Sequence, residues 1–447
     1  MAYKFRSARE IYSKGFDIFS PPSVEVATEA FYYEPFEHPQ ITKGQTLTFV
    51  IPSTSPDYIF LPWSYFKFKV KITKGANGEV TAEDKVGVVN NLFHSMWKSV
   101  DLYIGRERIT KNCDGNYHIK AYFDTLFYTD AESKETLLQA QGWYPDVGGS
   151  FTDMTMGDNP PNKGFAERSD FFQRGKEVEL TGMLFMDGAY DGSYGSSNRF
   201  LLNGVGLTIK LSPNDDKLIL MSPTDDADFR LNITSAAFYP CYVKCDSGIM
   251  VSHNEALVNK QNAIYPFQRS FHRQYQIKNL TTKFSDPDVF SGMTPSVMYL
   301  AITSQTAADG TYATNPFEFK HFNLCQIEVC VGGNRTSIQP LSCDYSSGEY
   351  LEAFTSLFPT RRDLVGLPFN RKAYPNGWCI YRFQLSPPSQ MFTDEDSSGM
   401  DTMTLLRKNN VTLNIQFSPG PSETVNLHVY AKFPDVYEVD LTRRVLN

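Results

Sequence analysis

The sequence predicts an all-β protein made of two tandem antiparallel β-sandwiches, and two observations carry this prediction. Residues 205–213, VGLTIKLSP, recur as VTLNIQFSP at 411–419, which indicates one structural unit built twice. Short segments in both halves, separated by turn-forming residues, alternate apolar and polar side chains. This pattern is typical of strands with one buried and one solvent-exposed face. Competing helical patterns are few, so sheets are expected to dominate.

Further corresponding positions support the duplication. They keep the same order in both halves: 94–105 with 321–332, Arg108 with Arg335, 122–127 with 350–354, and 231–233 with 427–429. The first of these pairs, HSMWKSVDLYIG and HFNLCQIEVCVG, aligns without gaps. A repeat of this length is far longer than a solenoid unit and therefore indicates two domains.

The chain is expected to divide into three parts. Residues 1–40 show no alternating or helical pattern of useful length, and Pro21-Pro22 favours an extended backbone, so an extended N-terminal arm is expected there. Residues 41–255 and 256–447 are expected to form the first and the second sandwich. A chain of 447 residues and 50.7 kDa is too long for one ordinary core, which agrees with two domains.

Strands are expected where apolar and polar side chains alternate. The clearest case is Tyr65–Ile72, YFKFKVKI, in which lysines interleave with aromatic and aliphatic residues. Further strands are expected at 100–104, 207–211, 297–302, 413–417 and 425–429, and short helices near 117–128 and 348–357. The polar segments 146–170 and 388–404 are expected to be surface loops.

The charge balance excludes a generally basic nucleic-acid-binding protein. The formal net charge is -8, and an acidic surface repels phosphates. Basic residues nevertheless gather at both termini, where they are candidates for contacts with an anionic partner or a neighbouring subunit. These candidate site residues are Lys4, Arg6, Arg9, Lys14, Arg443 and Arg444.

The cysteines indicate neither a disulfide framework nor a metal site. Seven cysteines, an odd number, are spread along the chain, and the N-terminal segment lacks the apolar stretch of a signal peptide. Synthesis inside a cell without a secretory signal is therefore expected. Cys241 and Cys245 have the sequence spacing of a partial zinc site but lack a second pair of ligands, so no metal or other cofactor is expected.

A catalytic function is not expected, although paired sandwiches also occur in sugar-cleaving enzymes. That chemistry requires two carboxylates about 5 to 10 Å apart in a cleft. The acidic clusters Asp215-Asp216, Asp225-Asp226 and Asp394–Asp396 all lie in polar, turn-like segments typical of solvated loops. His94 and His321 occupy equivalent positions in both halves, which favours a structural role for them.

One function class that two tandem sandwiches allow, kept as the alternative to the function given at the end of this subsection, is a two-domain β-sandwich protein that binds or processes carbohydrate. Such a protein stacks sugars on exposed aromatic rings, and Trp143 and Tyr144 in QGWYPD are the candidates for that surface. A carbohydrate-binding protein is expected to remain a small oligomer.

Several segments together resemble one family, the hexon-like major capsid proteins of Polintons, also called Mavericks, and of the related adintoviruses. The resemblance extends from residue 17 to the C-terminus. Its segments are DIFSPPSVEV, VIPSTSPDYIFL, VNNLFHSMWKSVDLYIGRERI, NPFEFKHFNL, YPNGWCIYRFQLSP and VNLHVYAKFPDVYEVDLTRRVLN.

This resemblance implies two eight-stranded jelly rolls side by side, a double jelly roll, assembled as a trimeric pseudo-hexagonal capsomer. It implies a major capsid protein of the virion, in the icosahedral shell of a Polinton-like double-stranded DNA virus or virus-derived element. The implied partners are the other subunits of a homotrimer, neighbouring capsomers and a single jelly-roll penton protein. Enclosed double-stranded DNA would be contacted at most indirectly, and an internal membrane is left open.

Overall fold

The computed structural model describes residues 28–39, 41–75, 78–81, 83–111, 115–190, 199–224, 228–336, 339–358, 366–385 and 408–446. In the first half of the chain these residues form a sandwich of two four-stranded antiparallel sheets. One sheet has the order β2 (Phe36–Glu37), β12 (Phe229–Tyr239), β5 (Tyr65–Lys74) and β9 (Glu177–Gly182). The other has the order β3 (Leu47–Ile51), β10 (Leu207–Pro213), β7 (Trp97–Ile104) and β8 (Glu107–Arg108).

The second half repeats this arrangement. Its first sheet has the order β14 (Ala263–Ile277), β22 (Val425–Val439), β16 (Val297–Ser304) and β20 (Ile380–Gln384). Its second sheet has the order β15 (Lys283–Asp286), β21 (Val411–Phe417), β17 (Leu324–Val331) and β18 (Asn334–Arg335). Two short strands extend these sheets: β23 (Val445–Leu446) pairs with β22, and β19 (Leu341–Ser342) pairs with β17. Both halves are thus eight-stranded jelly rolls with the same strand order, as the sequence predicted.

The strand pairing confirms the repeat seen in the sequence. Strand β7 pairs with β10, and the corresponding strand β17 pairs with β21. The register differs by two residues, because Leu102 pairs with Ile209, whereas its counterpart Val329 pairs with Leu413 and not with Ile415, the residue that matches Ile209 in the repeat. In the other sheet of each half, Leu231 pairs with Ile72 between β12 and β5, while Leu427 pairs with Ile302 between β22 and β16. The repeated segments therefore occupy equivalent strands with equivalent partners.

Two small sheets and several helices complete the described residues. The sheets are β1 (Thr28–Tyr33) with β13 (Cys241–Cys245) and β4 (Tyr58–Ile59), and β6 (Gly87–Val88) with β11 (Leu220–Met221). The α-helices are α2 (Leu92–Ser95), α3 (Tyr117–Tyr128), α4 (Ala131–Glu135), α5 (Lys163–Phe172), α6 (Asp216–Ile219), α7 (Ser247–Val258), α8 (Gln305–Asp309) and α9 (Leu351–Ser356). Three 3-10 helices are η1 (Leu61–Trp63), η2 (Leu137–Gln141) and η3 (Gln173–Gly175). None of the helices in these residues is long and apolar enough to cross a membrane.

Helix α7 connects the two halves. Within the described ranges, every strand pairing joins two strands on the same side of α7. The predicted domain boundary at 255/256 falls inside this helix, and the division of the chain at that point stays a prediction. Of the expected N-terminal arm, residues 1–27 lie outside the described residues, while β1 and β2 pair with β13 and β12.

The prediction of short helices is confirmed by α3 and α9, but the prediction for segment 146–170 is only partly correct. Residues 152–161 form an irregular segment with several exposed side chains, yet Phe151 and Phe165 are fully buried and α5 begins at Lys163. Its apolar residues are widely spaced among polar ones, so no periodic pattern marked them. The predicted loop 388–404 lies outside the described residues.

Candidate functional site: the interface between the two jelly rolls

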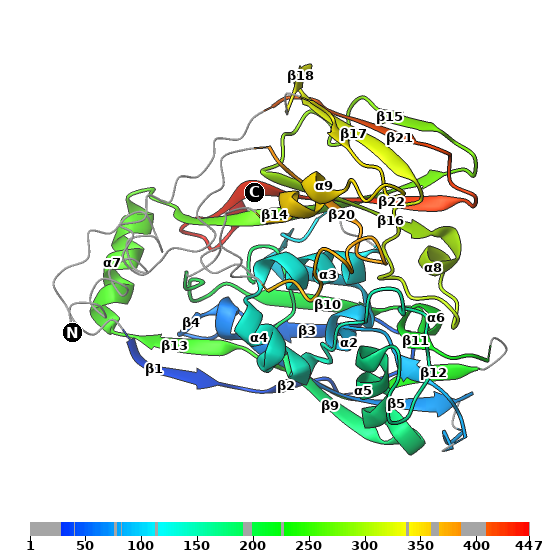
Figure 1. Cartoon of the computed structure of the whole chain (residues 1–447). Coiled ribbons are helices and arrows are strands. Elements are labelled where there is room, and N and C mark those ends of the chain that lie inside the picture. Colours follow the sequence, from blue (N-terminus) through cyan, green and yellow to red (C-terminus); the bar gives the residue numbers. More distant parts are fainter. Residues whose placement is uncertain are drawn as a thin grey trace.

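The four sheets are stacked, and α3 lies in the middle of the stack (Figure 1). On one side of α3 is the sheet that contains β10, and on the other is the sheet that contains β14, β16 and β22. All residues of this helix, from Tyr117 to Tyr128, are buried. The sequence of α3, YHIKAYFDTLFY, places apolar or aromatic residues on every side of the helix. Such a helix is stable only when other parts of the protein cover it on every side.

Aromatic rings of α3 stack on rings of the second jelly roll. Tyr122 stacks on Phe317 with 4.0 Å between the ring centroids and an interplanar angle of 6°. Phe123 stacks on Tyr430 at 5.5 Å, and Phe127 stacks on Tyr299 at 4.6 Å. Each such pair contributes about 0.5–1.5 kcal/mol beyond the area that it buries. The two halves therefore share one continuous core at this interface.

A buried network of charged side chains lies beside these rings. Lys120 is 3.1 Å from Asp187 and 3.5 Å from Asp124, two residues of the first half. Lys432 of the second half is 3.0 Å from Asp124, and all four side chains are at most 3% exposed. Two lysines and two aspartates balance in charge, which is what allows ions to be buried together.

Hydrogen bonds from uncharged donors connect this network to the second jelly roll. The hydroxyl of Tyr430 donates to Oδ1 of Asp124 at 2.6 Å, and the backbone N–H of Ser270 donates to Oδ2 of Asp187 at 2.8 Å. Burial, together with the nearby Asp124, raises the pKa of Tyr430 well above its usual value, so the hydroxyl keeps its proton and remains a donor. Both carboxylates thus bind groups from both halves.

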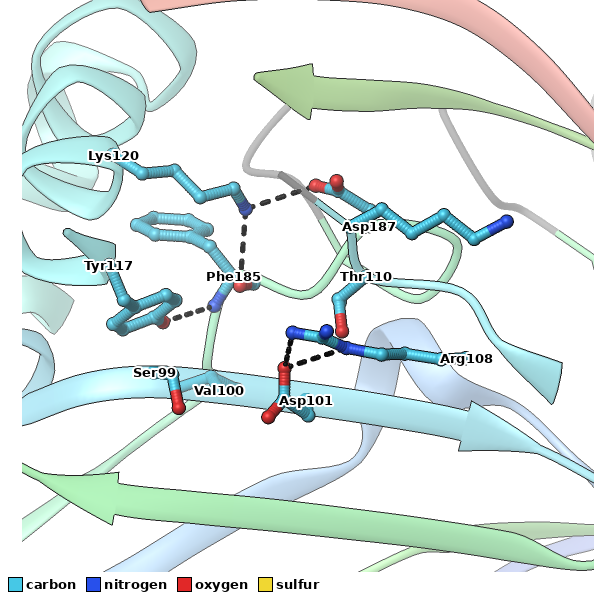
Figure 2. A pocket seen from close by; sticks show the side chains of 10 residues that line it. Ser99, Val100, Asp101, Arg108, Thr110, Tyr117, Lys120, Phe185 and Asp187 are labelled. Carbon is cyan, nitrogen blue, oxygen red and sulfur yellow. Dashed lines mark hydrogen bonds and ion pairs between the residues drawn. The ribbon is translucent and has the colours of Figure 1, made fainter. Parts of the chain in front are cut away.

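The space next to this network is too small for an organic substrate. Figure 2 shows Lys120 pointing toward Asp187 and the carbonyl of Phe185, while Arg108 points to Asp101 on the opposite side. The cavity between them has a volume of about 10 Å³. That volume suits a single water molecule. The arrangement can hold two domains together, but it offers no room for a substrate.

The segment 146–170 forms a second polar connection between the halves. Asp146 accepts hydrogen bonds from Nη2 of Arg168 at 2.7 Å and from Nδ2 of Asn162 at 2.9 Å. Its other oxygen accepts from Nδ2 of Asn315, in the second half, at 3.2 Å. These four side chains are at most 3% exposed. The buried residues of segment 146–170 therefore belong to the interface.

Each of the two equivalent histidines contacts a tyrosine, which is the first residue of α3 for His94 and lies a few residues before α9 for His321. Nδ1 of His94 is 3.0 Å from the hydroxyl of Tyr117, and its Nε2 is 3.0 Å from Oε1 of Gln141. Burial lowers the pKa of His94 to about 3, so this ring is neutral at pH 7. His321 stacks on Tyr345 with 4.1 Å between the ring centroids.

The candidate residues at the termini are only partly within the described residues. Lys4, Arg6, Arg9 and Lys14 lie outside them. Nη2 of Arg443 donates to Oδ1 of Asn203 at 3.1 Å and of Asn254 at 3.0 Å, so it links the C-terminal segment to the first half of the same chain. Arg444 is exposed. Contacts of these six residues with other subunits stay a prediction.

The candidates for carbohydrate chemistry are not brought together. Trp143 is only 2% exposed, and Tyr144 packs against Phe171 at 5.7 Å, so these two rings form no open stacking surface. Asp216 pairs with Lys43 at 2.6 Å, whereas Asp225-Asp226 and Asp394–Asp396 lie outside the described residues. Among the described residues, no three His, Cys, Asp or Glu side chains are grouped in a way that could hold a metal ion.

Sequence reasoning missed the buried network itself. The available signal was a lysine or an aspartate inside an otherwise apolar segment. Lys120 and Asp124 lie within HIKAYFDTLF, and Lys432 lies within HVYAKF. Charged residues in such segments are buried only when they are paired, so their presence in both halves could have suggested a pair.

No protein-family model matches the chain. A curated relative, the uncharacterized protein F54H12.2 of Caenorhabditis elegans, is 23% identical over 420 residues and covers 88% of this chain and 91% of that protein. A structure of the Sputnik virophage matches with a TM-score of 0.65 and 12% identity, covering 96% of this chain and 90% of that chain.

Two further solved structures are similar over nearly their whole length. The Faustovirus major capsid protein has a TM-score of 0.54 and 10% identity, with 94% of this chain and 92% of that chain covered. The mavirus major capsid protein has a TM-score of 0.51 and 12% identity, with 95% and 93% covered. Together with the strand order described above, these matches show that the chain has the double jelly-roll fold.

Proposed function

We propose that this chain is a major capsid protein that forms the icosahedral shell of a Polinton-like double-stranded DNA virus or virus-derived element. The observation that carries the proposal is the match of both jelly rolls, as one unit, to the Faustovirus and mavirus major capsid proteins over more than 90% of each chain. The resemblance of individual sequence segments to Polinton and adintovirus capsid proteins supports the finer assignment. The role is structural and needs neither a catalytic residue nor a cofactor.

The duplication explains how such a chain could build a shell. Three copies of a chain that contains two similar units place six similar walls around one axis, so a homotrimer acquires a nearly hexagonal outline. Such outlines pack against six neighbouring capsomers. A single jelly-roll penton protein would close the fivefold positions, and the protein would reside in the virion.

The buried interface around α3 suits this role. A capsomer wall has to keep its two jelly rolls in one fixed orientation, because neighbouring capsomers contact both. The ion network of Asp124 and Lys432 is satisfied in only one relative arrangement of the halves, and the stacked rings fill the space around it. The contacts among the described residues of the interface thus fix the orientation.

Particle formation tests the proposal. The chain would be produced alone and together with a single jelly-roll penton protein, and the products would be examined by negative-stain electron microscopy. We expect hexagonal capsomers from the chain alone and closed shells from the co-expression. If the chain remained monomeric at every concentration, both alone and together with the penton protein, the proposed function would be contradicted.

A further inference from the structure

The helix and the sheet that form the interface inside the chain each have a counterpart in the other jelly roll. Helix α3 follows β8 in the first jelly roll and packs on β16 and β22 of the second. By the repeat, α9 is the counterpart of α3, since it follows β18 and β19, and the sheet of β5 and β12 is the counterpart of the sheet of β16 and β22. The chain therefore carries a second helix and a second sheet face of the same types.

Helices α3 and α9 are anchored in equivalent ways. His94 contacts Tyr117 at the start of α3, and the aligned His321 contacts Tyr345, a few residues before α9. The sequence YFD at 122–124 then matches YLE at 350–352. Leu351 consequently corresponds to Phe123, and Glu352 corresponds to Asp124.

The strand registers identify which residues of the two sheets correspond. Leu300 pairs with Val429 between β16 and β22, and Val70 pairs with Ile233 between β5 and β12. Counting from these pairs, Lys69 corresponds to Tyr299. By the same count, Lys67 corresponds to Val297. Tyr299 is the residue that packs against Phe123 and Phe127 of α3, so Lys69 lies on the outward face of its own sheet.

The corresponding residues differ in exposure. Phe123 and Asp124 are fully buried against the second half, whereas Leu351 is 47% exposed and Glu352 is also exposed. On the sheet, Tyr65 and Tyr239 stack at 4.7 Å and remain half-buried. An exposed leucine on a short helix and stacked tyrosines on a sheet face are typical of a surface that another protein covers.

The charges of the two surfaces are complementary. Inside the chain, Asp124 pairs with Lys432, whose cross-strand neighbour is Val297. On the first-half sheet, Ala237 occupies the position of Lys432. The lysine is instead its cross-strand partner Lys67, the counterpart of Val297. The ammonium group is thus displaced by one strand but stays in the same row of the sheet, and Glu352 is the acidic residue of α9 at the position that Asp124 occupies in α3. In the single chain Lys67 is 2.9 Å from Glu179, and both side chains are at least 40% exposed.

We propose that the exposed face of α9 binds the outward face of β5 and β12 on a second copy of this chain. Glu352 of one copy lies near Lys67 of the next, and Leu351 lies over Lys69. The contact is head-to-tail, so three copies close into a ring in which the internal and the external contacts alternate. The proposal rests on the trimer proposed above and names the surfaces that form it.

A disulfide between engineered cysteines tests the contact. The double variant Leu351→Cys, Lys69→Cys would be oxidised with oxidised glutathione and analysed on a non-reducing gel. We expect covalent dimers and trimers that disappear on reduction, and neither single variant should give them. As a matched control, Leu280→Cys replaces Leu351→Cys in the pair; Leu280 is 74% exposed but lies in the turn after β14, so this pair should not cross-link.

Charge reversal provides an independent measurement. Glu352→Lys should weaken association about tenfold in sedimentation equilibrium, and the added change Lys67→Glu should restore most of it. Trimers that show neither the cross-link nor the charge effect would overturn this surface assignment while leaving the capsomer intact. A chain that stays monomeric at all concentrations would overturn both the surface assignment and the trimer.

Discussion

Asp124 and Lys432 form an ion pair of 3.0 Å between the two jelly rolls, with both side chains at most 2% exposed. Tyr430 binds the same carboxylate, although 306 residues separate it from Asp124 along the chain. Removing one member of such a pair leaves the other as an uncompensated buried charge, which makes the interface testable by single substitutions.

Asp124→Asn should strongly destabilise the protein. The amide cannot balance the charges of Lys120 and Lys432, so the free energy of unfolding should fall by about 3–5 kcal/mol in urea titrations followed by fluorescence. The control is Asp228→Asn, which removes an exposed pair with Arg230 and should leave the midpoint unchanged. Equal midpoints for Asp124→Asn and the parent protein would show that the network does not hold the halves together.

Tyr122→Ala should create a cavity between the halves. The ring stacks on Phe317 and is fully buried, so its loss should lower the free energy of unfolding by about 3–5 kcal/mol. Phe171→Ala, which removes a ring that is 48% exposed, is the matched aromatic control and should have a much smaller effect. The account would be wrong if both substitutions changed the stability equally.

Acid should destabilise the protein through its buried histidines. Burial lowers the pKa of His94 and of His428 to about 3, below the value of about 6.5 in the unfolded chain. Between these values the unfolded state binds a proton that the folded state does not. Stability is therefore unaffected by these groups above pH 6.5 and falls as the pH decreases toward 3, by about 1.4 kcal/mol per pH unit for each histidine.

The variants His94→Gln and His428→Gln isolate this effect from that of the carboxylates. Each should flatten the dependence of the melting temperature on pH between 6.5 and 4, even if it lowers the melting temperature at pH 7. A pH dependence with the same slope in the parent and in both variants would exclude the histidines as its source.

The thiols should react in an order set by burial. Cys325 and Cys330 are half-buried, whereas Cys343 and Cys379 are buried. Burial raises the pKa of Cys343 to about 11 and that of Cys379 still further, which lowers the reactive thiolate fraction. Timed alkylation with peptide mapping should therefore label Cys325 and Cys330 before Cys343, and Cys379 only on unfolding. Rapid labelling of Cys379 in the folded protein would contradict the core described above.

The strand pattern was predictable from sequence because it is local. Tyr65–Ile72 alternates strictly, and the repeat of 205–213 at 411–419 indicated the two units, whose strand orders then agreed. The interface was not predictable in the same way. Nothing near Asp124 in the sequence indicates that Lys432 completes its pair, and the burial of Asp146 depends on Asn315, far along the chain. Such contacts depend on how the two halves pack, which no local pattern encodes.

The most direct test of the central claim is the mass of the purified chain in solution, measured by light scattering coupled to size-exclusion chromatography, with negative-stain images of the same peak. The account predicts a mass three times that of the 50.7 kDa chain and hexagonal outlines. A stable species with the mass of one chain, without such outlines, would contradict it.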